Sequence, residues 1–463
     1  MGNVSDMTVG SPTRAILQFA IPLIAGYLLQ QMYMVADAAI VGQYVGVGAL
    51  AAVGTSSSIM FLVMGFCTGT SLGFSIPVAH AFGAKDFGLM RRYVAGAVRL
   101  SVLIAVVLTV VTTLLTTPIL KAINAPADIM SDAYIFLLLQ FLTIPFTIGY
   151  NLLAGFIRAL GNSRQPFYVL ILSSLLNIVL DMLLIVGCGL GVEGAGVATM
   201  AAQAFAVLLC YIYIRRSLPM LGLQISSKPE ACSKGLYLTL LNNGVPMGLQ
   251  FSITGIGIIM LQSANNALGT TYVAAFTACM RVKYLFTCVF ENIGAAMATY
   301  CGQNIGARKV ERIALGIRSA LKIMLCYFLF TLAIIWPLAD EMMLLFVDPS
   351  ETAIIDNAAL FMRICNYYYP VLGLLTILRY SIQGLGHSNL SMLSGVMEML
   401  ARGSVAVWLV PAWGFLGVIY GDPVAWLSAD LFLVPCMFLL YRHLKRKKQS
   451  GQQYKHHFKV NNP

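Results

Sequence analysis

The sequence predicts an all-α polytopic membrane protein with twelve transmembrane helices in two pseudo-symmetric six-helix bundles. Its composition is the first reason: of 463 residues, 59% are hydrophobic and only 10% are charged, whereas soluble proteins carry about 25% charged residues. Mean hydropathy is +0.82. The second reason is that long apolar segments recur along the whole chain. The third is that the two halves of the chain repeat each other.

The apolar segments have the length of membrane-spanning helices, which need about 20 residues to cross a bilayer. A membrane β-barrel would instead show shorter segments of alternating polarity. Between Asp37 and Lys85 there is no Asp, Glu, Lys or Arg, and the stretch "GQYVGVGA" (42–49) divides this run into two spans. The predicted spans are residues 15–41, 49–80, 93–117, 131–157, 166–187, 194–214, 240–266, 271–302, 313–338, 355–383, 390–411 and 416–441.

Charged residues sort the predicted loops into two sides. Basic residues gather in alternate loops and in the tail "YRHLKRKKQSGQQYKHHFKV", whereas the other loops are mostly acidic. The positive-inside rule therefore predicts that both termini are cytoplasmic. Much of the net charge of +11 lies in this tail, beside a span, which favours contact with the anionic lipid of the bilayer over binding of nucleic acid. Because Arg14 directly precedes a long span, we expect a retained first helix and not a signal peptide.

The repeat has an offset of 223 to 225 residues. "AFGAKDFGLMRRY" (81–93) resembles "NIGARKVERIALG" (304–316), and "IRALGNSRQPF" (157–167) resembles "IQGLGHSNLSM" (382–392). Pro22 of the first span corresponds to Pro246 of the seventh. Since each half holds six spans, the halves have the same orientation and form parallel repeats, an arrangement that transporters use. We predict an N-lobe over 1–216, a cytoplasmic linker over 217–237, a C-lobe over 238–445 and a basic cytoplasmic tail over 446–463.

Two carboxylates lie inside predicted spans of the first half. Asp181 follows Asn177 by one helical turn in "LLNIVLDMLLIV", and Asp37 lies near the end of the first span. Shifted by the repeat offset, neither position falls on an acidic residue in the second half, so the shared architecture does not require these acids. Thr199, early in the sixth span, offers another oxygen nearby. We expect Asp37, Asn177, Asp181 and Thr199 to form one site.

The occupant of this site is left open by the residues. A charge at mid-bilayer costs about 2.5–3.5 kcal/mol on insertion scales, so Asp181 should either be protonated or bind a cation. Two carboxylates together with amide and hydroxyl oxygens are also suitable ligands for a Na⁺ ion. A further alternative is that these residues are only hydrogen-bonding links between helices.

Other polar and flexible residues in the first half are candidates for lining a substrate cavity. Gln30 and Tyr33 share a helix face with Asp37. The thioethers of Met34, Met60 and Met64 could serve in core packing or in a promiscuous drug pocket. Pro22 should weaken its helix and form a hinge.

We expect several of the charged residues in the predicted spans of the second half to form ion pairs or to lie near helix ends. Glu398 and Arg402 are four residues apart and should neutralise each other. Arg281, Lys283, Arg363 and Arg379 are expected near helix ends, where long basic side chains reach the interface. The roles of Glu291, Asp422 and Asp430 are left open.

Enzyme motifs are absent from the sequence. The ten cysteines form no CxxC pair, the histidines show no metal-ligand spacing, and there is no P-loop. We expect no cofactor beyond a coupling H⁺ or Na⁺, and no enzymatic activity.

Several stretches together resemble the multidrug and toxic compound extrusion (MATE) family, and particularly its DinF-like branch. The resemblance covers about residues 12 to 445, through Pro22, "VADAAIVG", "AFGAKD", "RALGNSRQPF", "LNIVLDMLLIVGCGLGVEGAGVAT", "GQNIGARKVER" and "IQGLGHS". In DinF-like members the first lobe carries the cation site, and its residues match Asp37, Asn177, Asp181 and Thr199. Gln30, Tyr33 and Asn151 match polar positions around that cavity. The NorM-like branch has a Glu on its seventh helix where this chain has Thr254.

The resemblance implies a cation-coupled antiporter that works by alternating access in the bacterial cytoplasmic (inner) membrane, as a monomer. Its substrate would be a small organic molecule, cationic or amphipathic, bound between the lobes. The alternative is a flippase for lipids or lipid-linked oligosaccharides, which would need Arg281, Lys283, Arg363 or Arg402 to hold a phosphate. A third alternative, a membrane-embedded enzyme, would need a catalytic constellation that the sequence lacks.

Overall fold

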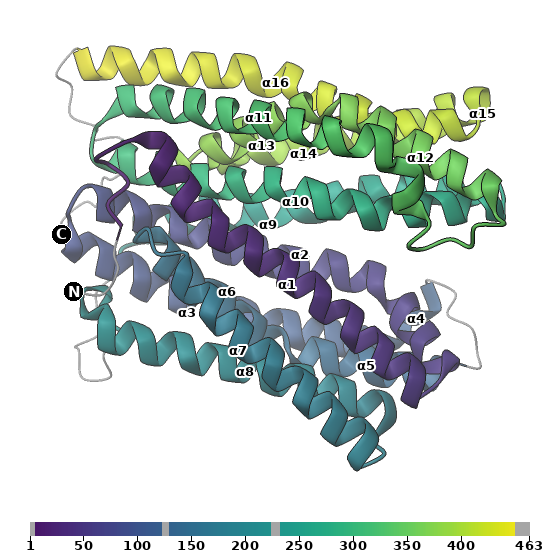
Figure 1. Cartoon of the computed structure of the whole chain (residues 1–463). Coiled ribbons are helices and arrows are strands. Elements are labelled where there is room, and N and C mark those ends of the chain that lie inside the picture. Colours follow the sequence, from purple (N-terminus) through teal and green to yellow (C-terminus); the bar gives the residue numbers. More distant parts are fainter. Residues whose placement is uncertain (1–4, 123–128, 224–231, 450–463) are drawn as a thin grey trace. The chain divides into compact units, whose positions relative to one another are not determined.

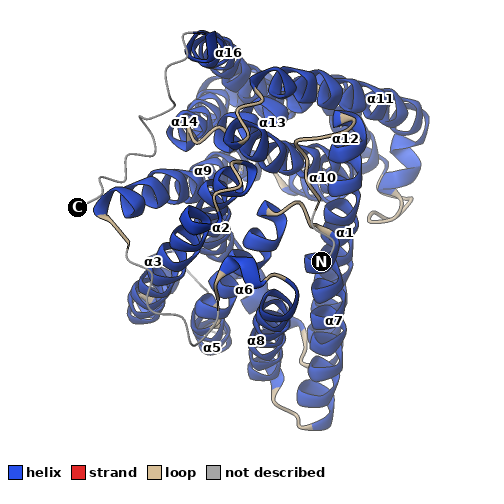
Figure 2. Cartoon of the chain, turned by 90° about the vertical axis from the view of Figure 1, so that its left-hand side faces the viewer, coloured by secondary structure: helices blue, strands red, loops and turns tan. Residues whose placement is uncertain are grey.

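The computed structural model describes residues 5–122, 129–223 and 232–449, and this part of the chain is helical, with short turns and no strand (Figures 1 and 2). The helices are α1 (Pro12–Tyr44), α2 (Val47–Gly83), α3 (Phe87–Leu114), α4 (Thr116–Ala122), α5 (Met130–Leu142), α6 (Ile144–Ala159), α7 (Arg164–Asp181), η1 (Met182–Gly187), α8 (Gly191–Ser217), η2 (Pro219–Leu221), α9 (Lys234–Asn266), α10 (Thr270–Gly306), α11 (Val310–Met343), α12 (Thr352–Tyr367), α13 (Tyr369–Gly384), α14 (Ser388–Ser404), η3 (Val405–Leu409), α15 (Val410–Trp413) and α16 (Phe415–Gln449).

The predicted spans are confirmed, with ends that shift by a few residues. Eleven segments of the described chain are long and apolar enough to cross a membrane. The remaining predicted span, 355–383, coincides with α12 and α13, two helices of 16 residues each that meet at Tyr368. The predicted span 131–157 is interrupted in the same way, between α5 and α6 at Thr143.

A proline explains each of these interruptions. Pro145 lies at the start of α6 and Pro370 at the start of α13. A proline has no backbone N–H and its ring disfavours helical conformation in the preceding residue, so the helix before it ends or kinks. The two prolines are 225 residues apart, so the break belongs to the repeat.

The chain forms two compact units. The first contains Ile21–Gly248, and the second contains Met7–Ala20 together with the chain from Leu249 to the end of α16. Helices α1 and α9 are thus each divided between the units, close to Pro22 and Pro246. The N-lobe and C-lobe boundaries drawn from the sequence remain predictions, and residues 224–231 of the linker and 450–463 of the tail lie outside the described residues.

The first part of α9 belongs to the first unit because it packs closely on α2. A Cβ atom at Gly73 would lie 2.5 Å from the Asn243 carbonyl oxygen, and one at Gly244 would lie 2.3 Å from the Phe74 ring. Small residues allow such close approach of two helix backbones.

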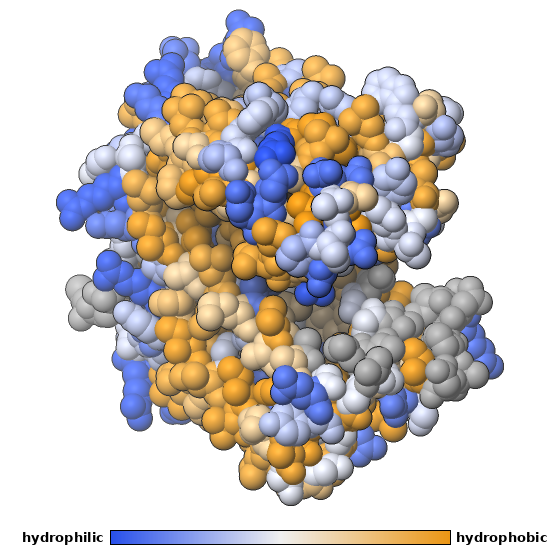
Figure 3. Space-filling view, turned by 45° about the vertical axis from the view of Figure 1, so that its right-hand side comes forward, coloured by the Kyte–Doolittle hydropathy of each residue, from blue (hydrophilic) through white to orange (hydrophobic). Residues whose placement is uncertain are grey.

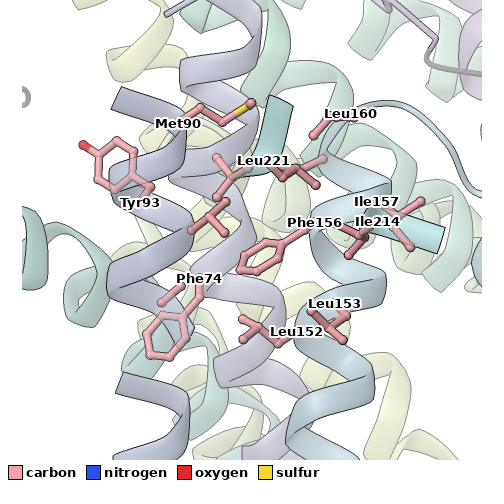
Figure 4. Close-up of a cluster of buried hydrophobic side chains, with 14 of the residues drawn as sticks. Phe74, Met90, Tyr93, Leu152, Leu153, Phe156, Ile157, Leu160, Ile214 and Leu221 are labelled. Atoms are coloured by element: carbon pink, nitrogen blue, oxygen red, sulfur yellow. The ribbon is translucent and has the colours of Figure 1, made fainter. Parts of the chain in front are cut away.

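A large apolar cluster holds the first unit together. Phe74 of α2, Tyr93 of α3, Phe156 of α6 and Ile214 of α8 are buried in it (Figure 4). Leu240 of α9 joins the same cluster. Helices α2, α3, α6 and α8 and the beginning of α9 therefore share one core, to which Val169 of α7 and Leu221 of η2 also contribute.

The outer surface of the helices is also apolar. On α3, Val102, Val106 and Val110 follow one another at four-residue spacing and are 59%, 55% and 51% exposed, so they form a stripe along one face. Apolar residues cover much of the surface seen in Figure 3. Such a surface suits contact with lipid and not with water.

The backbone confirms the internal repeat in detail. Gly46, before α2, and Gly269, before α10, have φ values of 114° and 111°. Lys85 and Arg308, after these same helices, have φ values of 59° and 58° and are the non-glycine residues with positive φ in the described chain. A lysine or arginine rarely adopts this left-handed conformation, so its recurrence at one position of both halves identifies the same turn.

Close helix packing at Gly384 provides a test of the fold. Gly384→Ala should lower the free energy of unfolding by about 1–3 kcal/mol, because the new Cβ atom would lie 2.4 Å from the backbone oxygen of Ala298. The matched control is Gly54→Ala, where nothing lies within 4 Å of the added atom and helix propensity favours alanine by about 1 kcal/mol. Thermal unfolding of both purified variants in one detergent measures the difference. Equal unfolding temperatures would contradict the described contact between α10 and α13.

Candidate cation site in the first unit

The end of α7 carries a buried acid. Asp181 is the last residue of α7 and is 0% exposed, and Asn177, one turn earlier, is 1% exposed. The π-helix η1 follows directly. π-helical segments are rare and frequently mark functional sites.

The Asn177 amide connects three helices. With its nitrogen directed at Asp181, it donates to Asp181 Oδ2 at 2.9 Å and to the Tyr33 hydroxyl of α1 at 3.2 Å. Its Oδ1 accepts from the backbone N–H of Thr199 in α8 at 3.1 Å. The Tyr33 hydroxyl is also within hydrogen-bonding reach of the Thr199 side chain. The amide one turn before the acid therefore fixes α1 and α8 against α7.

Asp37 of α1 completes this group. Its carboxyl group is close enough to that of Asp181 for the two side chains to hydrogen-bond to each other. The Oδ1 atoms of both residues are buried and have no hydrogen-bond partner in the described chain. The structure thus brings together all four residues expected at one site, Asp37, Asn177, Asp181 and Thr199, with Tyr33 as a fifth member.

No cation compensates this carboxyl pair among the described residues. The six ion pairs found in the described chain all lie in the second unit. Two ionised carboxylates in contact repel each other and have only acceptors to offer. One proton held between Asp37 and Asp181, or one bound cation, removes this conflict.

The oxygen atoms present also fit a Na⁺ ion. Asp37 and Asp181 each keep one oxygen free of hydrogen bonds. The Thr199 hydroxyl donates to the Ala195 carbonyl at 3.0 Å, so its oxygen can still act as a ligand, and the Asn177 carbonyl oxygen lies against the backbone N–H of Thr199. Carboxylate, amide and hydroxyl oxygens are hard ligands of the kind that such cations take. These four residues would hold the ion.

The packing of Gly194 positions Thr199. A Cβ atom added at Gly194 would lie 3.1 Å from a side-chain atom of Ile185 in η1. A Cβ atom added at the corresponding Gly417 of α16 would lie 2.6 Å from the backbone oxygen of Leu409 in η3. In both halves a glycine therefore lets a following helix, α8 or α16, approach the π-helical segment closely. Only the first half places an acid there, because Ser404 precedes η3.

The other residues predicted for a substrate cavity lie in the first unit but are not all at this site. Gln30 and Met34 are exposed on α1, Met34 at 56%. Met60 and Met64 are half-buried and pack against an apolar cluster that includes Phe141.

Asn151 and Pro22 have local surroundings. The half-buried Asn151 donates to the carbonyl of Thr147 in its own helix at 2.9 Å. Pro22 is half-buried within α1, beside the division between the units. Their functional roles stay predictions.

The second unit corrects one expectation from the sequence. Lys283 and Arg379 do not lie near helix ends at the interface but are buried within α10 and α13, at 3% and 4% exposure. They form ion pairs with Asp422 and Glu398. The predicted pair of Glu398 and Arg402 is confirmed at 3.3 Å.

The fold and this group of residues define a class of protein. Two repeated helical units in a membrane protein, with buried acids that form no ion pair, are features of secondary transporters. The chain belongs to the MatE family, whose model matches residues 22–183 and 246–408. These two matches begin at Pro22 and Pro246 and so follow the internal repeat.

Relatives support this assignment over nearly the full chain. The probable multidrug resistance protein YpnP of Bacillus subtilis (strain 168) is 25% identical over 447 residues, covering 95% of this chain and 96% of the relative. DNA damage-inducible protein F of Escherichia coli (strain K12) is 23% identical and covers 64% of this chain and 65% of its own. Multidrug export protein MepA of Staphylococcus aureus (strain NCTC 8325 / PS 47) is 20% identical and covers 92% and 93%.

Solved structures share the fold. The outward-facing conformation of a multidrug resistance MATE family transporter of the MOP superfamily has a TM-score of 0.89 at 22% identity, covering 96% of this chain and 99% of that one. A MATE structure in the bent conformation also has a TM-score of 0.89 at 22% identity, covering 97% and 99%. The prediction of a twelve-span MATE fold is thus confirmed.

The hydrogen bonds of the Asn177 amide provide a test of the site geometry. Asn177→Leu keeps the side-chain size but removes the hydrogen bonds to Asp181, Tyr33 and Thr199, so the free energy of unfolding should fall by about 1.5–3 kcal/mol. The matched control is Ser173→Ala, one turn earlier, whose hydroxyl donates only within its helix, to the Leu170 carbonyl at 3.1 Å. Thermal unfolding measures both. If Asn177→Leu were no less stable than Ser173→Ala, the described connection of α1, α7 and α8 would be wrong.

Proposed function

We propose that this chain is an antiporter that couples entry of H⁺ or Na⁺ to export of small organic compounds, cationic or amphipathic in character. The observation that carries the proposal is the contact between the Asp37 and Asp181 carboxyl groups without a basic partner in the described chain. Two relatives that the chain resembles over more than nine-tenths of its length are named as multidrug resistance and multidrug export proteins. The substrate leaves chemically unchanged, and no catalytic group is required.

Coupling in this proposal depends on charge at the carboxyl pair. One positive charge that moves inward through 100 mV contributes about 2.3 kcal/mol, and the site accepts one such charge as a proton or as Na⁺. Binding changes the hydrogen bonds that Asp181, Asn177 and Tyr33 make between α7, α8 and α1. Cation and substrate must alter each other's affinity by the same factor, so cation binding promotes release of substrate.

Pro22 is the proposed hinge of this coupling. It lies within α1, upstream of Asp37 on the same helix, and it removes one backbone hydrogen bond from the helix. A change in the packing of Asp37 can therefore bend α1 at Pro22, as alternating access requires. We propose that the protein operates in a bacterial cytoplasmic membrane with both termini on the cytoplasmic side.

The flippase alternative has less support from the structure. It needs free cationic side chains for a phosphate, yet Lys283 and Arg402 are each paired with Asp422, and Arg363 is paired with Asp340. Of the four candidates, Arg281 is the one that forms no ion pair in the described chain, and it lies over the Phe346 ring at 6.0 Å. The surroundings of these side chains therefore favour a substrate without a phosphate.

Replacement of the two acids tests the proposal directly. Asp37→Asn and Asp181→Asn should each reduce gradient-driven export of a fluorescent organic cation to the level of empty vesicles, because an amide cannot exchange a proton or neutralise Na⁺. The matched control is Glu193→Gln, an exposed carboxylate in the first turn of α8, which should keep wild-type export. Export measured in inverted vesicles with equal amounts of each protein gives the result. Undiminished, gradient-driven export in both Asp variants would exclude this site as the coupling site.

The identity of the coupling ion is tested with Thr199→Val. For a proton, export driven by an imposed pH gradient should persist in this variant, because the two carboxyl groups suffice. For Na⁺, the half-saturating Na⁺ concentration should rise roughly tenfold, as when a group that supports a metal site is lost. Proteoliposomes with one gradient imposed at a time separate these results. Export that follows neither gradient would contradict cation coupling altogether.

A further inference from the structure

The second unit contains a chain of buried charges that the proposed coupling site does not use. Lys283 of α10 pairs with Asp422 of α16, which also accepts from Arg402 Nε at 2.9 Å. Arg402 of α14 pairs with Glu398, and Glu398 pairs with Arg379 of α13. Bases and acids alternate in this series of ion pairs, and Lys283 and Arg379 are the bases at its two ends.

Two further carboxyl groups interact with Arg379, the base at one end of this series of buried charges. Glu291 of α10 and Asp430 of α16 both interact electrostatically with Arg379. Glu291 is exposed, and its Oε2 accepts from the Tyr380 hydroxyl at 3.1 Å. Asp430 is only 7% exposed, and both of its carboxyl oxygens are buried without a hydrogen-bond partner in the described chain.

A count of charges shows that one carboxylate is in excess. The group contains three bases, Lys283, Arg402 and Arg379, and four acids, Asp422, Glu398, Glu291 and Asp430. Glu398 is shared by Arg379 and Arg402, so the five paired residues carry one net positive charge, and Arg379 is the base among them with which Glu291 and Asp430 interact. One further carboxylate neutralises it, and a second would add an uncompensated negative charge in apolar surroundings.

The surroundings decide which of the two acids is neutral. Glu291 is exposed on α10 and accepts a hydrogen bond from Tyr380, and this hydrogen bond stabilises a negative charge. Asp430 has neither. A proton is also the one cation that needs no added ligands and no space beside Arg379.

We propose that Asp430 holds an exchangeable proton, as a second protonation site of this protein, and that the charge balance around Arg379 controls it. When Glu291 neutralises Arg379, Asp430 stays protonated. When Glu291 loses its charge, by protonation or by binding a cationic group, Asp430 releases its proton and takes over the compensation of Arg379. This site is separate from Asp37 and Asp181, and the inference does not rest on the proposed function.

Infrared difference spectroscopy tests the proton directly. The protein is measured in lipid nanodiscs at neutral pH with Asp37→Asn and Asp181→Asn already introduced, so that the first unit contributes no carboxylic acid signal. Adding Asp430→Asn should remove a C=O stretching band of a protonated carboxyl group. Glu311→Gln, which removes an exposed acid paired with Lys448, should leave that band intact. If Asp430→Asn removes only carboxylate absorption, Asp430 is ionised and the proposal is wrong.

Stability gives an independent test with two matched variants. Asp430→Asn replaces a neutral acid with a neutral amide of the same shape, so the unfolding temperature should stay near that of wild type. Glu398→Gln should lower it clearly, because Arg379 and Arg402 then lose their shared partner. Failure of Asp430→Asn to fold, or a decrease as large as that of Glu398→Gln, would show that Asp430 is an ionised partner of Arg379 and would overturn the proposal.

The exchange between the two acids is tested with Glu291→Gln. In this variant the Asp430 carboxylic acid band should disappear at neutral pH and a carboxylate band should replace it. The double variant Glu291→Gln with Asp430→Asn should lower the unfolding temperature by more than the two single decreases together, because Arg379 then lacks both acids. A persistent acid band in Glu291→Gln together with additive stability changes would contradict control through Arg379.

Discussion

The cost of a charge in apolar surroundings determines what the polar side chains of this protein do. An unpaired charge at mid-bilayer costs about 2.5–3.5 kcal/mol on insertion scales, so a buried acid requires a base, a proton or a bound cation. In the second unit, Glu398 and Asp422 meet this requirement with bases, because each of them contacts two. In the first unit, Asp37 and Asp181 form no ion pair with a described base and contact each other instead. The two units thus share a backbone plan but satisfy the same physical constraint in opposite ways.

The repeated backbone explains where an acid can be placed. Each half has a π-helical segment: α8 packs closely on η1 at Gly194, and α16 packs closely on η3 at Gly417. Such a segment leaves backbone groups in irregular positions, and neighbouring groups must satisfy them. The chain has placed Asp181 before η1, whereas Ser404 before η3 donates to the Leu400 carbonyl of its own helix at 2.8 Å. The architecture provides the position, and side chains give it chemistry in one half only.

Much of the fold could be predicted from the sequence because apolar length is a direct signal of a membrane span. The carboxyl pair could be predicted as well, since an acid in "LLNIVLDMLLIV" is conspicuous and Asn177 shares its helix face. The broken fourth and tenth spans were missed, although Pro145 and Pro370 were visible signals. The partners of Lys283 and Arg379 could not be predicted: they lie 139 and 19 residues away in the chain, and no local pattern indicates which acid a buried base will contact.

The contrast between the units also limits which cation each can hold. The carboxyl pair of the first unit has oxygen atoms of Asn177 and Thr199 beside it and forms no ion pair with a described base, so this site can accept either H⁺ or Na⁺. Asp430 lies near Arg379, whose positive charge opposes any second cation that stays separate from the carboxylate. A proton escapes this repulsion because it forms a covalent O–H bond and makes the group neutral. If the protein uses Na⁺, the ion therefore belongs to the first unit, while protonation of Asp430 depends on pH and on the charge of Glu291.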